Sequence, residues 1–121
     1  MNKRLYISMV LVSIACIACN DKECNTSSSL SFANDIQPIF NDNCATSGCH
    51  DVSTQKGGLN LSAGSSYAEL SQVGSGYINT SNPKSSVLYS SMRSNMPPNG
   101  VLDKCTLEKI EKWMEQGAKN N

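Results

Sequence analysis

Two cysteines and one histidine within seven residues constrain this chain more than any other feature. The segment 44–50 reads CATSGCH, and its His50 is the only histidine among 121 residues. The imidazole directly follows one thiol, and the second thiol lies one short turn away. This arrangement suits a covalently attached haem, in which Cys44 and Cys49 form thioethers with the vinyl groups and His50 is an axial ligand of the iron.

The spacer between the two cysteines is unusual, because it has four residues where the common attachment motif has two. Cys49 and His50 remain adjacent, so the thioether next to the axial ligand is unaffected. The additional residues can bulge outwards at Ser47-Gly48, because glycine adopts left-handed backbone angles without steric cost. The alternative is a pair of disulfide-bonded or zinc-binding cysteines beside an unrelated histidine. A zinc site needs four ligands, however, and the chain has no second Cys/His pair.

The N-terminal residues indicate export. A basic start at Lys3-Arg4 precedes a mostly apolar run over 5–18 that is too short to span a bilayer comfortably, and polar residues follow. A small residue before a cysteine at such a boundary is typical of a bacterial lipoprotein signal. We therefore expect a signal peptide over 1–18, lipidation of Cys19 and attachment to a membrane on the periplasmic or cell-surface side. Cys16 is the alternative lipid site, and an ordinary cleaved signal or an uncleaved anchor is the alternative to lipidation.

Export makes the cysteine count informative, because disulfides persist outside the cytoplasm. The chain has six cysteines. One is lost with the signal, one carries the lipid and two bind haem in this assignment, which leaves Cys24 and Cys105. We predict that these two form a disulfide between the N-terminal segment and the last helix. Two independent thiols are the alternative.

The remaining length is enough for one domain. Residues 19–31 are polar and predict a short tether, so the domain should cover 32–119. Without Lys3 and Arg4 the formal charge is −2. No basic patch or alternation of basic and aromatic residues suggests binding to nucleic acid.

The spacing of apolar residues predicts helices over about 36–43, 67–73, 83–93 and 104–116. Asp35, Asn82 and Asp103 are the expected caps of the first, third and last helix. The last helix carries an apolar stripe that should pack against the first helix and the haem; its members are Leu107, Ile110, Trp113 and Met114.

Met96 stands before Pro97-Pro98, which predicts a stiff, extended loop able to present a thioether to a metal. The usual role of a methionine is to fill a core. With His50 as one axial ligand and no second histidine, Met96 is the leading choice for the other. Met92 and an open axial position are the alternatives, and Met114 is a poorer choice because its helix position indicates the core.

In their order and spacing, these features resemble the bacterial class I cytochrome c domain, and specifically the planctomycete-type cytochrome c domain. The matching pieces lie within residues 32–118 and are DIQPIF at 35–40, CATSGCH at 44–50, GGL at 57–59, Pro83, SVLY at 86–89, MPP at 96–98, and residues 102–118 with Trp113 and Gly117-Ala118. The resemblance implies an all-α fold, namely a small cytochrome c-like helical domain with long loops around one covalent haem c. It also implies that His50 is the proximal and Met96 the distal ligand.

A monohaem electron carrier outside the cytoplasm, with redox proteins as its partners, is the function that these features predict. Methionine ligation and an apolar pocket would raise the reduction potential, because both favour the less charged ferrous state. We expect no catalytic activity, since no acid–base pair or activated nucleophile is evident. The alternatives are a haem subunit of a larger redox complex, an open-site haem that senses a gas or degrades peroxide, and a haem-free surface lipoprotein in which Cys44 and Cys49 pair with each other.

Overall fold

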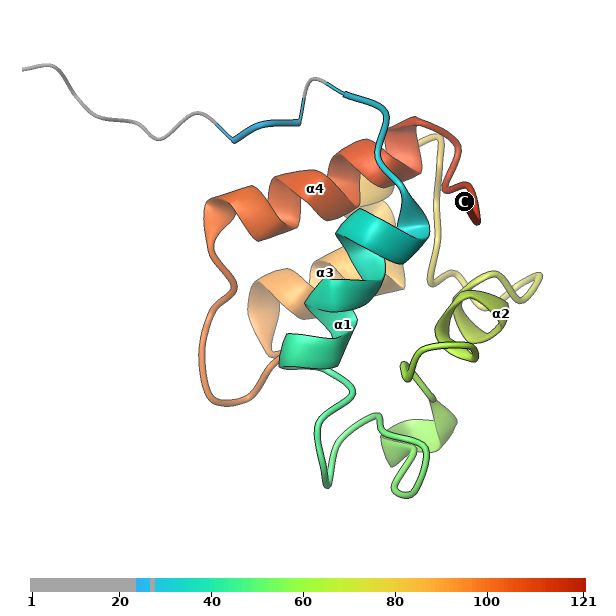
Figure 1. Ribbon diagram of the computed structural model, residues 1–121, viewed down its shortest axis with the longest axis vertical. Coiled ribbons are helices and arrows are strands. Elements are labelled where there is room, and N and C mark those ends of the chain that lie inside the picture. The colour runs from blue at the N-terminus through green and yellow to red at the C-terminus, as the bar shows by residue number, and fades with distance from the viewer. Residues whose placement is uncertain (1–23, 27) are drawn as a thin grey trace, which may run out of the picture.

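The computed structural model describes residues 24–26 and 28–121, and every regular element in this part of the chain is helical (Figure 1). In chain order the elements are the π-helical turn η1 (Phe32–Ile36), α1 (Gln37–Asn43), the 3-10 turn η2 (Lys56–Gly58), α2 (Ser66–Leu70), the 3-10 turn η3 (Pro83–Ser85), α3 (Val87–Ser94) and α4 (Lys104–Glu115). The predicted all-α class is thus confirmed for the described residues. The predicted signal peptide over 1–18 and the lipid sites Cys19 and Cys16 lie outside them. Within the described part, no helix is both long and apolar enough to cross a membrane.

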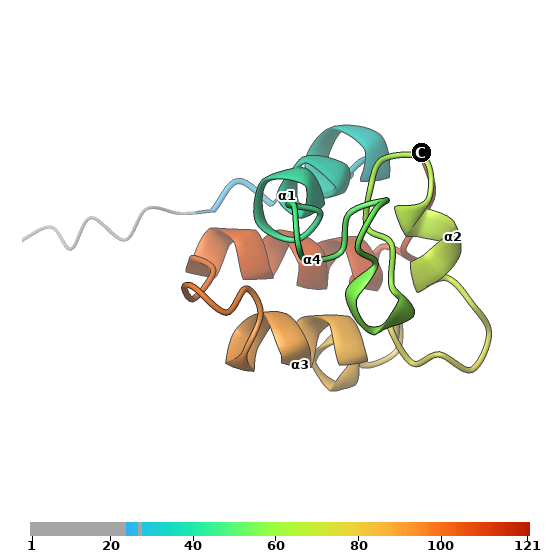
Figure 2. The same cartoon turned by 90° about the horizontal axis from the view of Figure 1, so that it is seen from below.

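Helix α4 lies between α1 and α3 in Figure 2, and it contacts η1 on one side and α3 on the other. Its N-terminus is capped by Asp103, whose carboxylate accepts a hydrogen bond from the backbone N–H of Thr106 at 3.0 Å. Ile110, Trp113 and Met114 on its inner face are at most 1% exposed. The cap and the apolar stripe are those that the sequence predicts, and the helix ends one residue earlier than expected.

The first helical segment begins earlier than the sequence predicts, and its cap is a different residue. Ser31, not Asp35, is the N-cap, and its hydroxyl accepts a hydrogen bond from the backbone N–H of Asn34. Asp35 lies inside the first turn and accepts the backbone N–H of Ser31 at 2.8 Å. The prediction of Asp35 as the cap was wrong because the chain is already helical before α1: the π-helical turn η1 begins at Phe32 and runs directly into α1. Pro38 still lies in the first turn of α1, where its missing N–H costs little.

The third predicted helix is divided into two. Pro83 begins the short turn η3, but Asn82 makes no capping hydrogen bond with its side chain. Ser86 is extended, with ψ of 147°, and its hydroxyl accepts the backbone N–H of Tyr89 at 3.1 Å, so α3 starts at Val87. The prediction of one continuous helix from Asn82 was wrong because a second capping residue lies four positions along the chain and stops the first turn.

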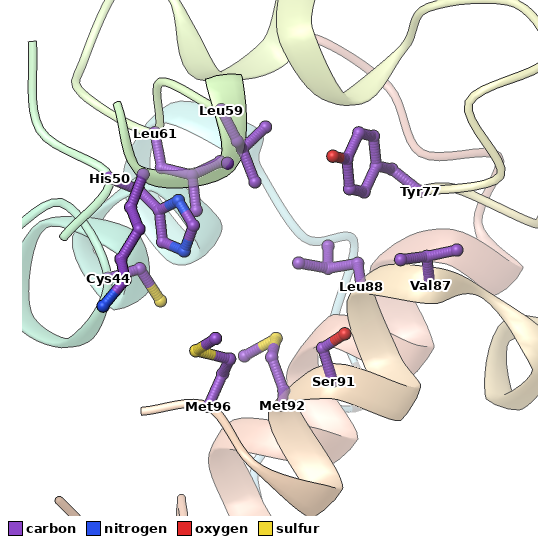
Figure 3. Close-up of a pocket in the computed structure, with 12 residues that line it drawn as sticks. Cys44, His50, Leu59, Leu61, Tyr77, Val87, Leu88, Ser91, Met92 and Met96 are labelled. Atoms are coloured by element: carbon purple, nitrogen blue, oxygen red, sulfur yellow. The ribbon is translucent and has the colours of Figure 1, made fainter. Parts of the chain in front are cut away.

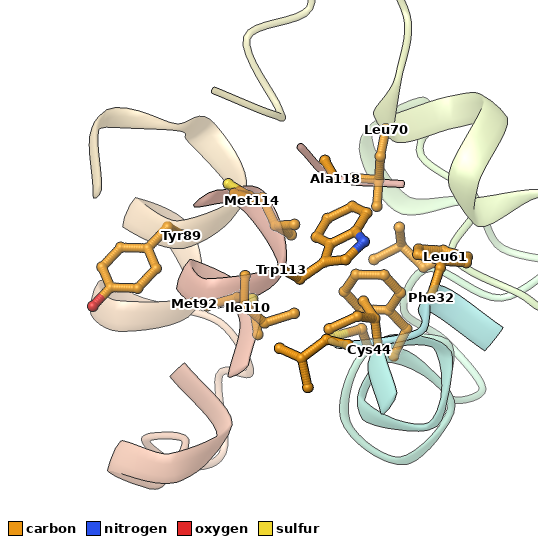
Figure 4. Close-up of a cluster of buried hydrophobic side chains, with 14 of the residues drawn as sticks. Phe32, Cys44, Leu61, Leu70, Tyr89, Met92, Ile110, Trp113, Met114 and Ala118 are labelled. Carbon is orange, nitrogen blue, oxygen red and sulfur yellow. The ribbon is translucent and has the colours of Figure 1, made fainter. Parts of the chain in front are cut away.

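The core forms where an aromatic cluster on η1 and α4 meets α2 (Figure 4). The ring centroid of Phe32 lies 5.4 Å from that of Trp113 and 5.2 Å from that of Tyr67. The Tyr67 hydroxyl donates a hydrogen bond to the carbonyl of Ala118 at 2.9 Å. Leu70, at the end of α2, is 1% exposed. Helix α2 begins one residue earlier and ends three residues earlier than the sequence predicts.

The N-terminal segment is fastened to α4 by a disulfide and by hydrogen bonds. Cys24 and Cys105, 81 positions apart, are joined as the sequence predicts. Gln116 accepts the backbone N–H of Leu30 at 2.9 Å and donates to the carbonyl of Ser28 at 3.1 Å. Leu30 itself is only 4% exposed. Contacts with the domain therefore begin before Phe32, within the residues that the sequence assigns to a polar tether.

Candidate cofactor site

A cavity of about 220 Å³ lies between the segment that follows α1 and the inner side of α3 (Figure 3). Its lining is mostly apolar and comes from two stretches of chain, 44–61 and 77–96. The lining residues are Cys44, His50, Lys56, Gly57, Leu59, Leu61, Tyr77, Val87, Leu88, Ser91, Met92 and Met96. A smaller cavity of about 40 Å³ adjoins it and is lined by Cys49, Pro97 and Pro98 in addition to four of the same residues and Asn43.

The predicted attachment segment folds into a closed loop between Cys44 and His50. The backbone N–H of Cys44 donates to the carbonyl of Phe40 at 2.8 Å, which holds the first cysteine at the end of α1. The N–H of His50 donates to the carbonyl of Cys44 at 3.0 Å and closes the loop. Residues 46–48 are exposed, and Gly48 has a φ of +83°. The additional spacer residues thus bulge into solvent, as the sequence predicts, and glycine supplies the left-handed backbone that the turn requires.

His50 projects towards the cavity, and its ring atom Nδ1 is buried without a hydrogen-bond partner. An unpaired buried polar atom costs about 1–3 kcal/mol. The backbone of this residue is well fixed, because its carbonyl accepts the N–H of Leu61 at 2.8 Å. The backbone of His50 is therefore fixed, while its ring atom Nδ1 makes no hydrogen bond.

The wall beside His50 is held by a buried amide. Gln37 on α1 donates through Nε2 to the carbonyl of Leu61 at 3.1 Å, and its Oε1 accepts the hydroxyl of Ser66. Gln37 is 7% and Ser66 1% exposed. These bonds link α1 and α2 to Leu61, which lines the cavity. The position of this side of the cavity thus depends on a polar network that the sequence does not predict.

Cys44 and Cys49 are free thiols in different environments. Cys44 is 7% exposed, whereas Cys49 is half-buried. Burial, with a smaller contribution from the nearby Cys49, raises the pKa of Cys44 to about 11. The structure does not pair these cysteines in the disulfide that the haem-free alternative assumed.

Two methionines form the side of the cavity opposite His50 (Figure 3). Met92 extends from α3 and is 2% exposed, and Met96 follows the end of the same helix. The backbone N–H of Met96 donates to the carbonyl of Ser91 at 2.9 Å, which fixes where the loop leaves the helix. Met114 is 0% exposed in the core and does not line the cavity.

The structure thus brings Cys44, His50 and Met96 to one cavity, and it places Cys49 at the adjoining one. Lys56, which lines both cavities, and Tyr77 were not predicted as site residues. The only sequence signal that Lys56 belongs to the site is its position before the Gly57-Gly58 turn, because this turn leads directly to Leu59, which lines the cavity.

Among residues 24–26 and 28–121, no three His, Cys, Asp or Glu side chains come together as a possible metal site. Neither the family models, nor the curated proteins, nor the solved structures contain a match to this chain. Arguments about function therefore depend on the residues of the cavity themselves.

The donor groups of this cavity and the adjoining one are of the types that a covalently bound haem requires. Two free thiols, an imidazole with an unpaired ring nitrogen and a thioether on the opposite side are the groups that such a cofactor requires from a protein. The volume is a constraint, because 220 Å³ is below the roughly 300–1,000 Å³ of pockets that enclose a drug-sized ligand. A macrocycle bound here would extend beyond the cavity or move its walls apart.

Proposed function

We propose that this protein is a monohaem c-type cytochrome that transfers electrons outside the cytoplasm. Cys44 and Cys49 would hold the haem through thioethers, and His50 and Met96 would be its axial ligands. The cytochrome c-like fold is part of the same proposal. The haem would supply one-electron redox chemistry, with no chemical change to a substrate.

One observation carries this proposal: His50 and Met96 face each other across a single apolar cavity that Cys44 also lines (Figure 3). Met96 lies 46 positions after His50 in the chain, and the helical domain brings it to the same cavity as the 44–50 segment. An imidazole and a thioether on opposite sides of an iron are the usual pair in electron-transferring cytochromes c.

The apolar walls have a defined role in this function. Leu59, Leu61 and Leu88 are at most 9% exposed and give the cavity apolar walls. An apolar surrounding disfavours the more highly charged ferric state and so raises the reduction potential. The exposed Lys56 lies at the cavity and offers a positive charge to a propionate.

A position on a membrane completes the proposal. Lipidation of Cys19, or of Cys16, would keep the domain at the periplasmic or cell surface, where the Cys24–Cys105 disulfide is stable. Soluble or membrane-bound redox proteins would be the partners.

The test is to express the chain together with a cytochrome c maturation system and extract it with acidified acetone. Haem that stays on the protein, with sharp reduced absorption bands, would support the proposal. The ferric protein should also show the far-red charge-transfer band that a methionine sulfur produces. A colourless protein would contradict the proposal.

Variants at the methionines define the distal ligand. Met96→Leu should abolish the far-red band, and Met114→Leu is the matched control, because Met114 lies in the core away from the cavity. Loss of the band in Met92→Leu and its retention in Met96→Leu would transfer the role to Met92. A haem-loaded wild type without this band would support an open axial site.

A haem-free surface lipoprotein is the second candidate, and one observation favours it. Ile36, Phe40, Ile110 and Met114 are 0% exposed and do not line the cavity, so the protein's own side chains cover this part of the core. The extraction experiment distinguishes the two candidates, because only the cytochrome retains covalent haem. A haem subunit of a larger complex would instead be recognised by co-purification of the coloured protein with one fixed partner.

A further inference from the structure

Four soft or borderline metal donors line the main cavity. They are the thiol of Cys44, the thioethers of Met92 and Met96, and the imidazole of His50. Figure 3 shows the sulfur atoms of Met92 and Met96 turned towards the side of the cavity where Cys44 and His50 lie. Cys44 and Met92 are 7% and 2% exposed, so two of the sulfur atoms belong to buried side chains.

The composition of this donor set selects among metals. Thiolate and thioether ligands favour monovalent copper, whereas calcium and magnesium require oxygen ligands. No carboxylate lines the cavity. Zinc sites use cysteine, histidine and carboxylate ligands, and one cysteine with one histidine does not complete such a set.

We propose that the haem-free chain binds one Cu(I) ion in this cavity through Cys44, Met92 and Met96, with His50 as the nitrogen donor. The thiol loses its proton to solvent as the copper–sulfur bond forms, and the copper remains monovalent. The charges of the thiolate and Cu(I) cancel, so the occupied cavity carries no net charge. A neutral complex avoids the cost of burying an unpaired charge among leucines.

This inference goes beyond the proposed electron transfer and does not depend on it. It concerns the chain before any haem is attached. Since Cys44 and His50 serve both roles, copper and haem would exclude each other. Copper binding would therefore protect the Cys44 thiol from reaction until the ion is removed.

The experiment uses the full-length chain produced without a haem maturation system. Under anaerobic conditions, the protein competes for Cu(I) with a coloured copper(I) chelator. The wild type should remove one copper ion per chain. Met92→Leu and Met96→Leu should each weaken binding at least about tenfold, since loss of an outer-shell partner alone costs 10–100-fold. Met114→Leu, the same change in a core methionine outside the cavity, should bind as the wild type does.

Two controls keep the result interpretable. Methionine and leucine are similar in volume, so the variants should fold, and far-ultraviolet circular dichroism verifies this. Met96 is only half-buried, which makes its variant the less disruptive of the two. Zn(II) offered in the same assay should bind far more weakly than Cu(I).

Three outcomes would overturn the proposal. The first is no copper uptake by the folded wild type, and the second is equal affinity for zinc. The third is unchanged copper binding in both methionine variants, which would show that neither methionine is a ligand. None of these bears on haem attachment, which is measured on separately matured protein.

Discussion

Removal of the Cys24–Cys105 disulfide should destabilise the domain strongly. The bond joins residues 81 positions apart, and the chain-entropy model gives about 4.5 kcal/mol for a loop of this size. Domains of this length are stable by only about 5–15 kcal/mol. The double variant Cys24→Ser/Cys105→Ser should therefore lose a large part of its free energy of unfolding, although Leu30 and Gln116 still hold the segment to α4.

The assay is urea denaturation of a chain that starts after the predicted signal, followed by the fluorescence of Trp113. This is the only tryptophan, and it is 1% exposed, so its emission should change on unfolding. The midpoint and slope together yield the free energy of unfolding. Reduction of the wild type should reproduce the loss, and the double variant should not respond to reductant.

A loss below about 1 kcal/mol in both the variant and the reduced wild type would refute this reasoning, because loop closure alone predicts several times more. Such a result would mean that the unfolded chain is compact enough for the crosslink to remove little freedom, or that the bond is strained in the native state.

Two further predictions use the same denaturation assay. The pKa of Cys44 is about 11 in the folded protein and ordinarily 9.0, so between these values the native thiol keeps a proton that the unfolded thiol has lost. The free energy of unfolding should therefore fall by up to about 3 kcal/mol as the pH rises from 9 to 11. A wild-type pH profile as flat as that of Cys44→Ala would contradict this prediction. Asp103→Ala removes the carboxylate that accepts the Thr106 N–H and should lower the free energy of unfolding by about 1 kcal/mol. Asp103→Asn keeps a hydrogen-bond acceptor and should lower it less. Equal losses in the two variants would show that this hydrogen bond does not account for the stabilising effect of Asp103.

Helix α4 could be predicted almost completely, because its signals are local. A capping aspartate stands directly before an apolar stripe of helical spacing, and no second cap competes with it. The first and third helices were less predictable because each has two candidate caps. Ser31 acts in place of Asp35, and Ser86 interrupts the helix that Asn82 was expected to start.

The donors of the candidate site could be identified from residue type and spacing, but its walls could not. Cys44, His50 and Met96 carry distinctive chemistry, and each is recognisable in the sequence. Gln37 is an ordinary polar residue whose bonds to Leu61 and Ser66 exist only after three segments have come together. Contacts of this kind leave no periodic or compositional signal in the chain.

In the loop from Cys44 to His50, different parts of the structure determine the positions of the two ends and the number of residues between them. Sequence patterns treat these two properties as one. The end of α1 and the bond from His50 N–H to the Cys44 carbonyl determine where the loop begins and ends. Its length is accommodated by residues 46–48, which lie in solvent. A search that requires a fixed number of residues between two cysteines thus tests the part that the fold leaves free to vary. A chain that preserves the two ends of such a loop but changes its length would not match the search. A genome-wide count based on the fixed spacing would therefore be too low.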